Sequence, residues 1–369
     1  MRVLHVVKGL GPGGAERLLV SLASVTDRTQ VEHQVAYVLD WKQHLVPELD
    51  ALDVPTHLLA GPRGLADPRW PQRLRTLGRE ADVVHLHSPA VAAVARPVLR
   101  SMRGGPAVVS TEHNVWPSHG RVTRLGNAST LPLDRVRWAV SEEVRASMWG
   151  PWQGRTEVLI HGAPVAAIAA RRDARVSTRT ERGWADTDVV VATVANLRAN
   201  KDYPTLFAAA AQALARSPHL RFVAIGQGPL EAELRAALAT YDLGDRFVML
   251  GYHEDPVSVL AGADVFALSS RHEGLPISLL EAIALGLPPV VTNVGGNAEV
   301  VTHDQDGLLV PPADPAALAD ALVRIAEDEP LRRRLGVAAR HRADDFDIAR
   351  TARILEARYR SIVGLPPGP

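Results

Sequence analysis

Short apolar runs alternate with longer amphipathic stretches along the chain, and these two patterns predict strands and helices in turn. In the first half, apolar, mostly β-branched runs bounded by turn residues predict strands at 3–7, 34–39, 83–86, 107–110 and 136–140. Helical spacing lies between them, for example at 15–23 and 90–99. Such alternation is typical of parallel α/β architecture.

The alternation starts again in the second half. It predicts strands at 189–194, 221–225, 247–250, 265–268, 289–292 and 308–310, and helices at 205–215, 230–239, 278–285 and 315–326. Between the halves, residues 161–185 are rich in arginine and show no clear period. We interpret them as a linker, with a surface loop inside one domain as the alternative. The sequence therefore predicts two Rossmann-like α/β domains with a cleft between them, and ligands at the carboxyl ends of the strands.

Composition narrows the function classes. The chain of 369 residues is 46% hydrophobic and 22% charged, has no net charge and contains no cysteine. These values are ordinary for globular proteins, and they exclude disulfides and thiolate metal sites. The apolar start is short and is interrupted by Lys8, so no targeting segment or membrane span is expected. We expect a cytoplasmic protein. Its mildly basic first half also suits an anionic acceptor or peripheral contact with the inner face of a membrane.

A glycine-rich loop follows the first predicted strand. Gly9-Leu10-Gly11-Pro12-Gly13-Gly14 has the spacing G-x-G-x-x-G, and Asp40 ends the second strand. An NAD-dependent dehydrogenase is therefore one alternative. Taken alone, the loop predicts only that its backbone approaches a phosphate group at a helix N-terminus.

The most informative segment is Arg271-His-Glu273-Gly-Leu-Pro-Ile-Ser-Leu-Leu-Glu281-Ala-Ile-Ala-Leu-Gly-Leu-Pro288. Glu273 falls in the loop after a predicted strand, and a helix begins near Ile277 or Ser278. Free amides in the first turn of that helix suit an anion. Glu281 lies about one turn into the helix, so two carboxylates can accept hydrogen bonds from two different hydroxyl-bearing groups.

This segment resembles the E-x7-E signature of the family-4 retaining glycosyltransferases, which have the GT-B fold. Gly13-Gly14-Ala15-Glu16, Gly295-Gly296-Asn297-Ala298-Glu299 and Asp306-Gly307-Leu308-Leu309-Val310 also resemble segments of that family. The resemblance implies that Glu273 holds the donor sugar and Glu281 the ribose. It further implies an acceptor domain at 1–165, a donor domain at 166–345, and a helix at 346–369 that crosses back to the N-terminal domain.

Two basic residues follow the first strand of the second half. Arg198 can bind two phosphate oxygens and Lys201 can supply a point charge, as a metal-independent enzyme of this family requires for its leaving diphosphate. The family's usual arginine position, five residues before the lysine, holds Asn196 here. Arg198 is therefore expected to replace that arginine.

The resemblance implies further contacts with the donor, a UDP- or GDP-sugar that acts as co-substrate, with no cofactor and no metal. These donor contacts are Gly13, Gly14, Asn196, Gly226, Gly251, Tyr252, His253, Gly274, Leu275, Pro276, Ile277 and Ser278. His113, at the end of a strand, is expected near the donor sugar as a catalytic residue with Glu273, Arg198 and Lys201. His85, His87 and His113 could suggest a metal site, but no carboxylate or further histidine shows ligand spacing with them.

The predicted reaction moves a hexose to a glycan, lipid-linked or small-molecule acceptor with retained anomeric configuration. A basic, partly aromatic acceptor face is expected from Arg69, Trp70, Arg73, Arg75, Arg96, Arg100 and Arg103. Besides a dehydrogenase, a sugar-nucleotide epimerase of the same fold and a non-catalytic nucleotide-binding module remain alternatives. Nucleic acid is not an expected partner.

Overall fold

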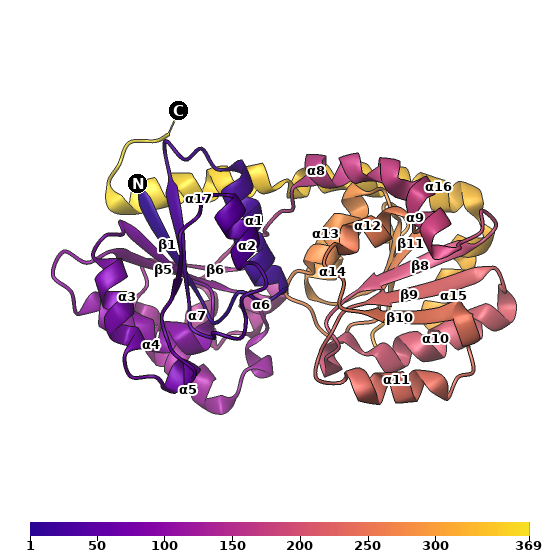
Figure 1. The fold of residues 1–369 in the computed structure, drawn as a ribbon, viewed down its shortest axis with the longest axis horizontal. Helices are drawn as coiled ribbons and strands as arrows, with labels where there is room; N and C mark the ends of the chain where they lie inside the picture. Colours follow the sequence, from indigo (N-terminus) through magenta and orange to yellow (C-terminus); the bar gives the residue numbers. More distant parts are fainter. Residues whose placement is uncertain (369) are drawn as a thin grey trace. The chain divides into compact units, whose positions relative to one another are not determined.

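The computed structural model describes residues 1–368, which form two compact units (Figure 1). Unit 1 comprises Met1–Gly162 and the segment that begins at Ile348, and unit 2 comprises Ala163–Asp347. The last helix thus belongs to the same unit as the first strand.

Unit 1 is built on a parallel sheet with the order β3-β2-β1-β4-β5-β6-β7. Its strands are β1 (Arg2–Val7), β2 (Glu32–Tyr37), β3 (Thr56–Leu58), β4 (Val83–Leu86), β5 (Ala107–Glu112), β6 (Val136–Ala139) and β7 (Glu157–Val158). Strand order reverses between β1 and β4, and at such a switch point the carboxyl ends of neighbouring strands open a ligand site.

Helices cover both faces of this sheet (Figure 1). They are α1 (Gly14–Val25), α2 (Val46–Ala51), α3 (Trp70–Gly78), α4 (Pro89–Arg100), α5 (Arg121–Thr130), α6 (Glu142–Ser147), α7 (Gly150–Gln153) and α17 (Ile348–Val363). Short 3-10 turns lie at Gly64–Ala66, Trp116–Ser118 and Leu131–Leu133.

The alternation of side chains along each strand explains these two layers. Leu4 and Val6 of β1 point into a core formed with α3 and α4. Val3 points to the opposite face, where it packs in a second core with Leu22 of α1 and Leu355 of α17. Unit 1 therefore completes one of its hydrophobic cores with a helix from a distant part of the sequence.

Unit 2 has a parallel sheet with the order β10-β9-β8-β11-β12-β13. Its strands are β8 (Val189–Val194), β9 (Leu220–Ile225), β10 (Phe247–Gly251), β11 (Val265–Leu268), β12 (Pro289–Thr292) and β13 (Leu308–Val310). Here the order reverses between β8 and β11, which places the loops after these two strands at the switch point.

From β8 onward, helices alternate with the strands of unit 2, and four of them match the helices predicted at 205–215, 230–239, 278–285 and 315–326. The α-helices of unit 2 are α8 (Val165–Ala170), α9 (Arg175–Arg182), α10 (Tyr203–Arg216), α11 (Glu231–Ala239), α12 (Pro256–Ala261), α13 (Ile277–Ala284), α14 (Gly295–Val300), α15 (Pro315–Glu327) and α16 (Glu329–Ala343). Shorter 3-10 turns lie at Arg171–Ala174, Ala199–Lys201, Gly244–Arg246 and Asp344–Phe346.

The arginine-rich stretch expected to be a linker is helical, so that interpretation is wrong. Helix α8 packs against α13, and α9 packs against α12. Asp264 anchors α9, because it accepts hydrogen bonds from Arg175 at 2.6 Å and from Arg179 at 3.0 Å. Polar contacts thus replace the apolar stripe by which a helix is normally recognised in a sequence.

Candidate functional site

The predicted donor-binding segments of unit 2 meet at the carboxyl edge of its sheet. Backbone hydrogen bonds join the loops: Leu197 N donates to Gln227 O at 3.0 Å, Gly226 N to Gly251 O at 2.8 Å, and Gly296 N to Gly274 O at 3.1 Å. Segments that lie far apart in the sequence are therefore held in one continuous rim above β8, β9, β10 and β11.

Lys201 and Glu273 are in direct contact at the centre of this rim. Lys201 Nζ lies 2.5 Å from Glu273 Oε1, and the two side chains are only 15% and 6% exposed. Ser270 Oγ donates to the same carboxylate oxygen at 2.5 Å. The sequence assigned these two residues to different parts of a ligand, and the structure brings them together as one ion pair at the β8–β11 switch point.

Asp202 fixes the backbone that carries Lys201. It has a left-handed conformation with φ 48° and ψ 49° and caps α10. Its carboxylate accepts hydrogen bonds from Thr205 Oγ1 at 2.8 Å and from Arg271 Nε at 2.9 Å. Ser269 Oγ donates to the Lys201 carbonyl at 2.9 Å. Sequence reasoning missed this support, although Arg271 is the first residue of the Glu273–Glu281 segment and Asp202 directly follows Lys201.

Two glycines of the rim allow backbone segments to approach closely. A Cβ atom on Gly226, whose φ is +152°, would lie 1.9 Å from the carbonyl oxygen of Ala195. A Cβ on Gly296 would lie 2.4 Å from the carbonyl oxygen of Gly274. Only glycine fits at these positions, so the close approach of these loops depends on both residues. The sequence predicted Gly226 as a donor contact and placed Gly296 in a segment that resembles the family.

Helix α13 begins inside the predicted motif. Pro276 is its N-cap, and Ser278 Oγ donates to the carbonyl of Val194 at the end of β8 at 2.8 Å. Gly274 is buried, and Leu275, Ile277 and Glu281 are partly exposed. The first-turn amides of a helix lack partners within the helix, so this end of α13 favours negative charge beside Lys201.

Other predicted donor contacts lie on the same rim and are more open to solvent. Asn196 and Arg198 are both exposed in the loop after β8. Tyr252 is 46% exposed after β10. His253 is partly buried, with Nε2 3.3 Å from Arg182 Nη2. The cationic side chain of Arg198 is thus accessible in the loop that also leads to Lys201.

The predicted residues of unit 1 also follow strand ends. Gly13 is the N-cap of α1 and Gly14 its first residue, directly after β1 and its loop. His113 follows β5, and its Nε2 lies 3.1 Å from Nδ1 of His87, which follows β4. Burial lowers the pKa of His113 to about 4, so the ring is neutral at physiological pH.

The expected basic and aromatic face of unit 1 is wrong in two of its members. Trp70 is 2% exposed and packs in the core, and Arg96 is fully buried. Arg96 Nε donates to Asp134 Oδ1 at 2.8 Å, and its Nη1 donates to Asn127 Oδ1 at 2.7 Å. These contacts satisfy the guanidinium internally, so it cannot contribute to a surface that binds an acceptor.

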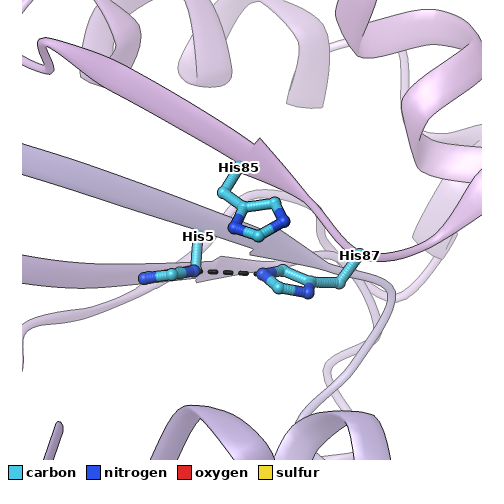
Figure 2. A group of neighbouring side chains, drawn as sticks. All are labelled: His5, His85 and His87. Atoms are coloured by element: carbon cyan, nitrogen blue, oxygen red, sulfur yellow. Dashed lines mark hydrogen bonds between the residues drawn. The ribbon is translucent and has the colours of Figure 1, made fainter. Parts of the chain in front are cut away.

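Three buried histidines lie close together on the sheet of unit 1, as Figure 2 shows. His5, His85 and His87 each offer a ring nitrogen within 4.8 Å of the others, as a metal site would require. However, His5 Nδ1 is hydrogen-bonded to His87 Nε2 at 3.0 Å. Both nitrogens of His85 have partners as well, Tyr359 at 2.5 Å and Thr111 at 2.7 Å. The ring nitrogens of this cluster are therefore engaged with one another, with the neighbouring histidines His33 and His113, and with hydroxyl groups.

Comparison with known proteins gives two family matches that cover different parts of the chain. The model of the family described as "Glycosyltransferase Family 4" matches residues 12–153, and that of "Glycosyl transferases group 1" matches residues 175–342. Together they span most of both units. They support neither the dehydrogenase alternative nor a non-catalytic module.

Individual relatives agree with these matches. The 2-deoxystreptamine glucosyltransferase of Streptomyces kanamyceticus is 26% identical over 318 residues, 80% of this chain and 79% of that protein. The UDP-Gal:alpha-D-GlcNAc-diphosphoundecaprenol alpha-1,3-galactosyltransferase of Escherichia coli is 36% identical over 132 residues, which are 35% of this chain and 34% of that protein.

A solved structure, Anabaena HepE in complex with UDP and glucose, has the same fold. The two structures superpose with a TM-score of 0.86 at 21% identity, over 98% of this chain and all of HepE. Among residues 1–368, no helix is long and apolar enough to cross a membrane.

Proposed function

The chain belongs to the family-4 glycosyltransferases, and from this premise we propose that it transfers a hexose from a UDP- or GDP-sugar, without a metal ion and with retention. The acceptor would be a carbohydrate, a lipid-linked sugar at the inner face of a membrane, or a small molecule. The UDP in the HepE complex and the lipid-linked acceptor in the name of the Escherichia coli relative support this choice.

The contact between Lys201 and Glu273 carries the proposal. An ammonium group has three N–H donors, and one of them is directed to Glu273 at 2.5 Å. The others are available for phosphate oxygens, while the carboxylate retains lone pairs for a sugar hydroxyl. In a nucleotide sugar, the negatively charged diphosphate is joined directly to a sugar ring that carries several hydroxyl groups. An ammonium group next to a carboxylate matches this junction, because the first can bind the phosphate and the second can accept a hydrogen bond from a sugar hydroxyl.

Further residues of the same rim would complete the donor site in unit 2. We assign the diphosphate to Lys201, the exposed Arg198 and the first-turn amides of α13, and the ribose to Glu281. Backbone of the glycine turns at Gly226 and Gly251 would face the nucleotide. In unit 1, the resemblance assigns Gly13 and Gly14 to the diphosphate and His113 to the transferred sugar.

The proposed chemistry depends on stabilising the leaving diphosphate and does not use a covalent bond between the sugar and the protein. Cleavage of the anomeric C–O bond builds positive charge on the sugar and negative charge on the leaving diphosphate. Lys201 and Arg198 would stabilise that negative charge. The acceptor would attack the face from which the diphosphate departs, and the departing phosphate would take the proton of the acceptor hydroxyl.

Ligand-dependent thermal stability tests the donor site without knowledge of the acceptor. The chain is heated with UDP, GDP, ADP, NAD or a nucleotide sugar, each at about 100 times its dissociation constant, which adds about 2.7 kcal/mol of stability. Lys201→Met and Glu281→Gln are compared with the wild type. Arg216→Met is the matched control, since Arg216 is a half-exposed base at the opposite end of α10 and is paired with Asp320.

We expect UDP or GDP to stabilise the wild type and Arg216→Met, and the shift to be lost in Lys201→Met and reduced in Glu281→Gln. Stabilisation by NAD alone, or equal shifts in all four proteins, would overturn the site assignment. With the correct nucleotide sugar and an acceptor, transfer should also withstand EDTA, and proton NMR of the product should show the anomeric configuration of the donor.

A further inference from the structure

A continuous chain of hydrogen-bonded histidines runs across the sheet of unit 1. His33 Nδ1 lies 2.9 Å from His5 Nε2, His5 Nδ1 lies 3.0 Å from His87 Nε2, and His87 Nδ1 lies 3.1 Å from His113 Nε2. Figure 2 shows the central bond of this chain. Every ring uses Nε2 toward the His33 end and Nδ1 toward the His113 end, so the chain has a uniform polarity.

The order of the strands makes this chain possible. His33 lies on β2 and His5 on β1, while His87 and His113 follow β4 and β5 directly. These four strands are consecutive neighbours in the sheet. Each strand therefore places one imidazole on the same face, about one strand spacing from the next.

The rings of this chain are neutral at physiological pH. Burial lowers the pKa of His33 and of His113 to about 4, and it lowers the pKa of His5 and His87 well below the usual value. A neutral imidazole has one N–H donor and one acceptor nitrogen. Four neutral rings in a row therefore admit only two fully bonded arrangements, with all protons on Nε2 or all on Nδ1.

Thr26 selects between these two arrangements. Its hydroxyl donates its single proton to the carbonyl of Leu22, with Oγ1 2.7 Å from that oxygen. The Thr26 oxygen is also 3.1 Å from His33 Nε2 and can only accept there. His33 must therefore carry its proton on Nε2, which makes its Nδ1 an acceptor for His5. The same logic passes along the chain to His113.

We propose that Thr26 and the histidine chain fix His113 in the Nε2–H tautomer, so that its Nδ1 accepts a hydrogen bond from a hydroxyl group. Thr26, His33, His5 and His87 are then positioning residues for His113. The tautomer assignment depends only on unit 1. The identification of the hydroxyl as one on the transferred sugar rests on the proposed function.

This assignment excludes one role for His113 and defines another. With Nδ1 unprotonated, His113 cannot donate from that nitrogen to a phosphate oxygen. It can orient a sugar hydroxyl by accepting its proton in a hydrogen bond. A bound metal ion at His5, His85 and His87 would be incompatible with the chain, because it would replace the proton between His5 and His87.

NMR of the histidine ring nitrogens tests the tautomer directly. The sample is the full-length protein, labelled with 15N-histidine and free of ligand. Long-range 15N–1H correlations distinguish a protonated from an unprotonated ring nitrogen, and the His113 signals are identified by their loss in His113→Asn. Thr26→Val removes the accepting oxygen at the far end while preserving side-chain size. Thr26→Ser, which keeps the hydroxyl, is the control.

We expect unprotonated Nδ1 in His113 of the wild type and of Thr26→Ser. In Thr26→Val, the arrangement with protons on Nε2 loses the hydrogen bond to Thr26 that made it more stable than the other arrangement. The Nδ1 signal of His113 should therefore move toward the protonated value, about halfway if both arrangements become equally populated. Protonated Nδ1 in the wild type, or an unchanged signal in Thr26→Val, overturns the proposal. One equivalent of zinc in the purified wild type that is lost in His85→Gln also overturns it.

These readings are independent of the proposed function. A protein that binds no nucleotide sugar can still show the predicted tautomer, and the donor assay can succeed while the tautomer prediction fails. If both hold, Thr26→Val should retain stabilisation by the nucleoside diphosphate while its rate of sugar transfer falls about twofold, in proportion to the fraction of His113 that keeps Nδ1 free.

Discussion

Replacement of Arg96 by methionine should destabilise unit 1 strongly, because it leaves a carboxylate buried. The side chains of Arg96 and Asp134 are both 0% exposed. Besides Asp134 and Asn127, the guanidinium donates to Thr130 Oγ1 and Ser110 Oγ, each at 3.1 Å. Removal of one partner of a buried pair typically costs about 3–5 kcal/mol, and we expect a loss in that range for Arg96→Met.

The size of this loss should depend on pH. Burial already raises the pKa of Asp134, and Arg96 opposes that effect. Without Arg96 the pKa rises further, so folded Asp134 holds a proton that the unfolded chain releases above about pH 4. The unfolding free energy of the variant, relative to the wild type, should therefore fall by up to about 1.4 kcal/mol per pH unit as pH rises.

Urea denaturation at pH 5.5 and pH 8, followed by tryptophan fluorescence, measures this difference, because Trp116 and Trp138 are buried in unit 1. Arg96→Met/Asp134→Asn should regain at least about 2 kcal/mol of the loss at pH 8, since the side chain that was paired with Arg96 is then uncharged. Arg100→Met, an exposed position on the same helix, should change stability by less than about 0.5 kcal/mol. A loss for Arg96→Met below about 1 kcal/mol, or an equal loss at both pH values, would refute the reasoning.

Two further predictions concern the histidine chain and the rim of unit 2. Folded His33 stays neutral down to a pKa of about 4, whereas an unfolded histidine gains a proton near pH 6.5, so stability is lost as pH falls between these values. Urea titrations of His33→Gln should show a slope smaller by about 1.4 kcal/mol per pH unit in this window, and parallel curves would contradict the assignment. Gly226→Ala should cost about 1–3 kcal/mol in thermal unfolding and weaken nucleotide stabilisation, because its Cβ meets the Ala195 carbonyl. Gly154→Ala, in open space, is its control, and equal effects of the two changes would argue against the clash.

The strands that the sequence predicted well are those made of buried apolar runs. Strands β8, β11, β12 and β13 have the predicted limits, because a strand covered on both faces is apolar throughout. Strands β3 and β7 were missed, since segments of three and two residues cannot display a period. Helix α9 was missed because Asp264, which holds it, lies 85 residues beyond Arg179 in the sequence.

The same limit applies to the candidate site. Motif spacing placed Lys201 and Glu273 at strand ends, but nothing local indicates that residues 72 positions apart form an ion pair. Arg96 looked like a surface residue because its partners, Asn127, Thr130 and Asp134, come from other elements. The chain from His33 to His113 was missed for a similar reason, since it depends on the order of four strands in space.

The position of α17 in unit 1 has a consequence for synthesis. Ile348, Leu355 and Tyr359 share a core with Val3 and Val83, yet the ribosome adds them only after all of unit 2. Unit 2 is continuous in sequence and can fold as it emerges. The N-terminal part of unit 1 leaves the ribosome first, and one apolar face of its sheet stays uncovered until α17 has been synthesised. Chaperones that bind nascent chains should therefore occupy the N-terminal half longer than the C-terminal half, and premature termination before residue 348 should expose the earlier unit to degradation.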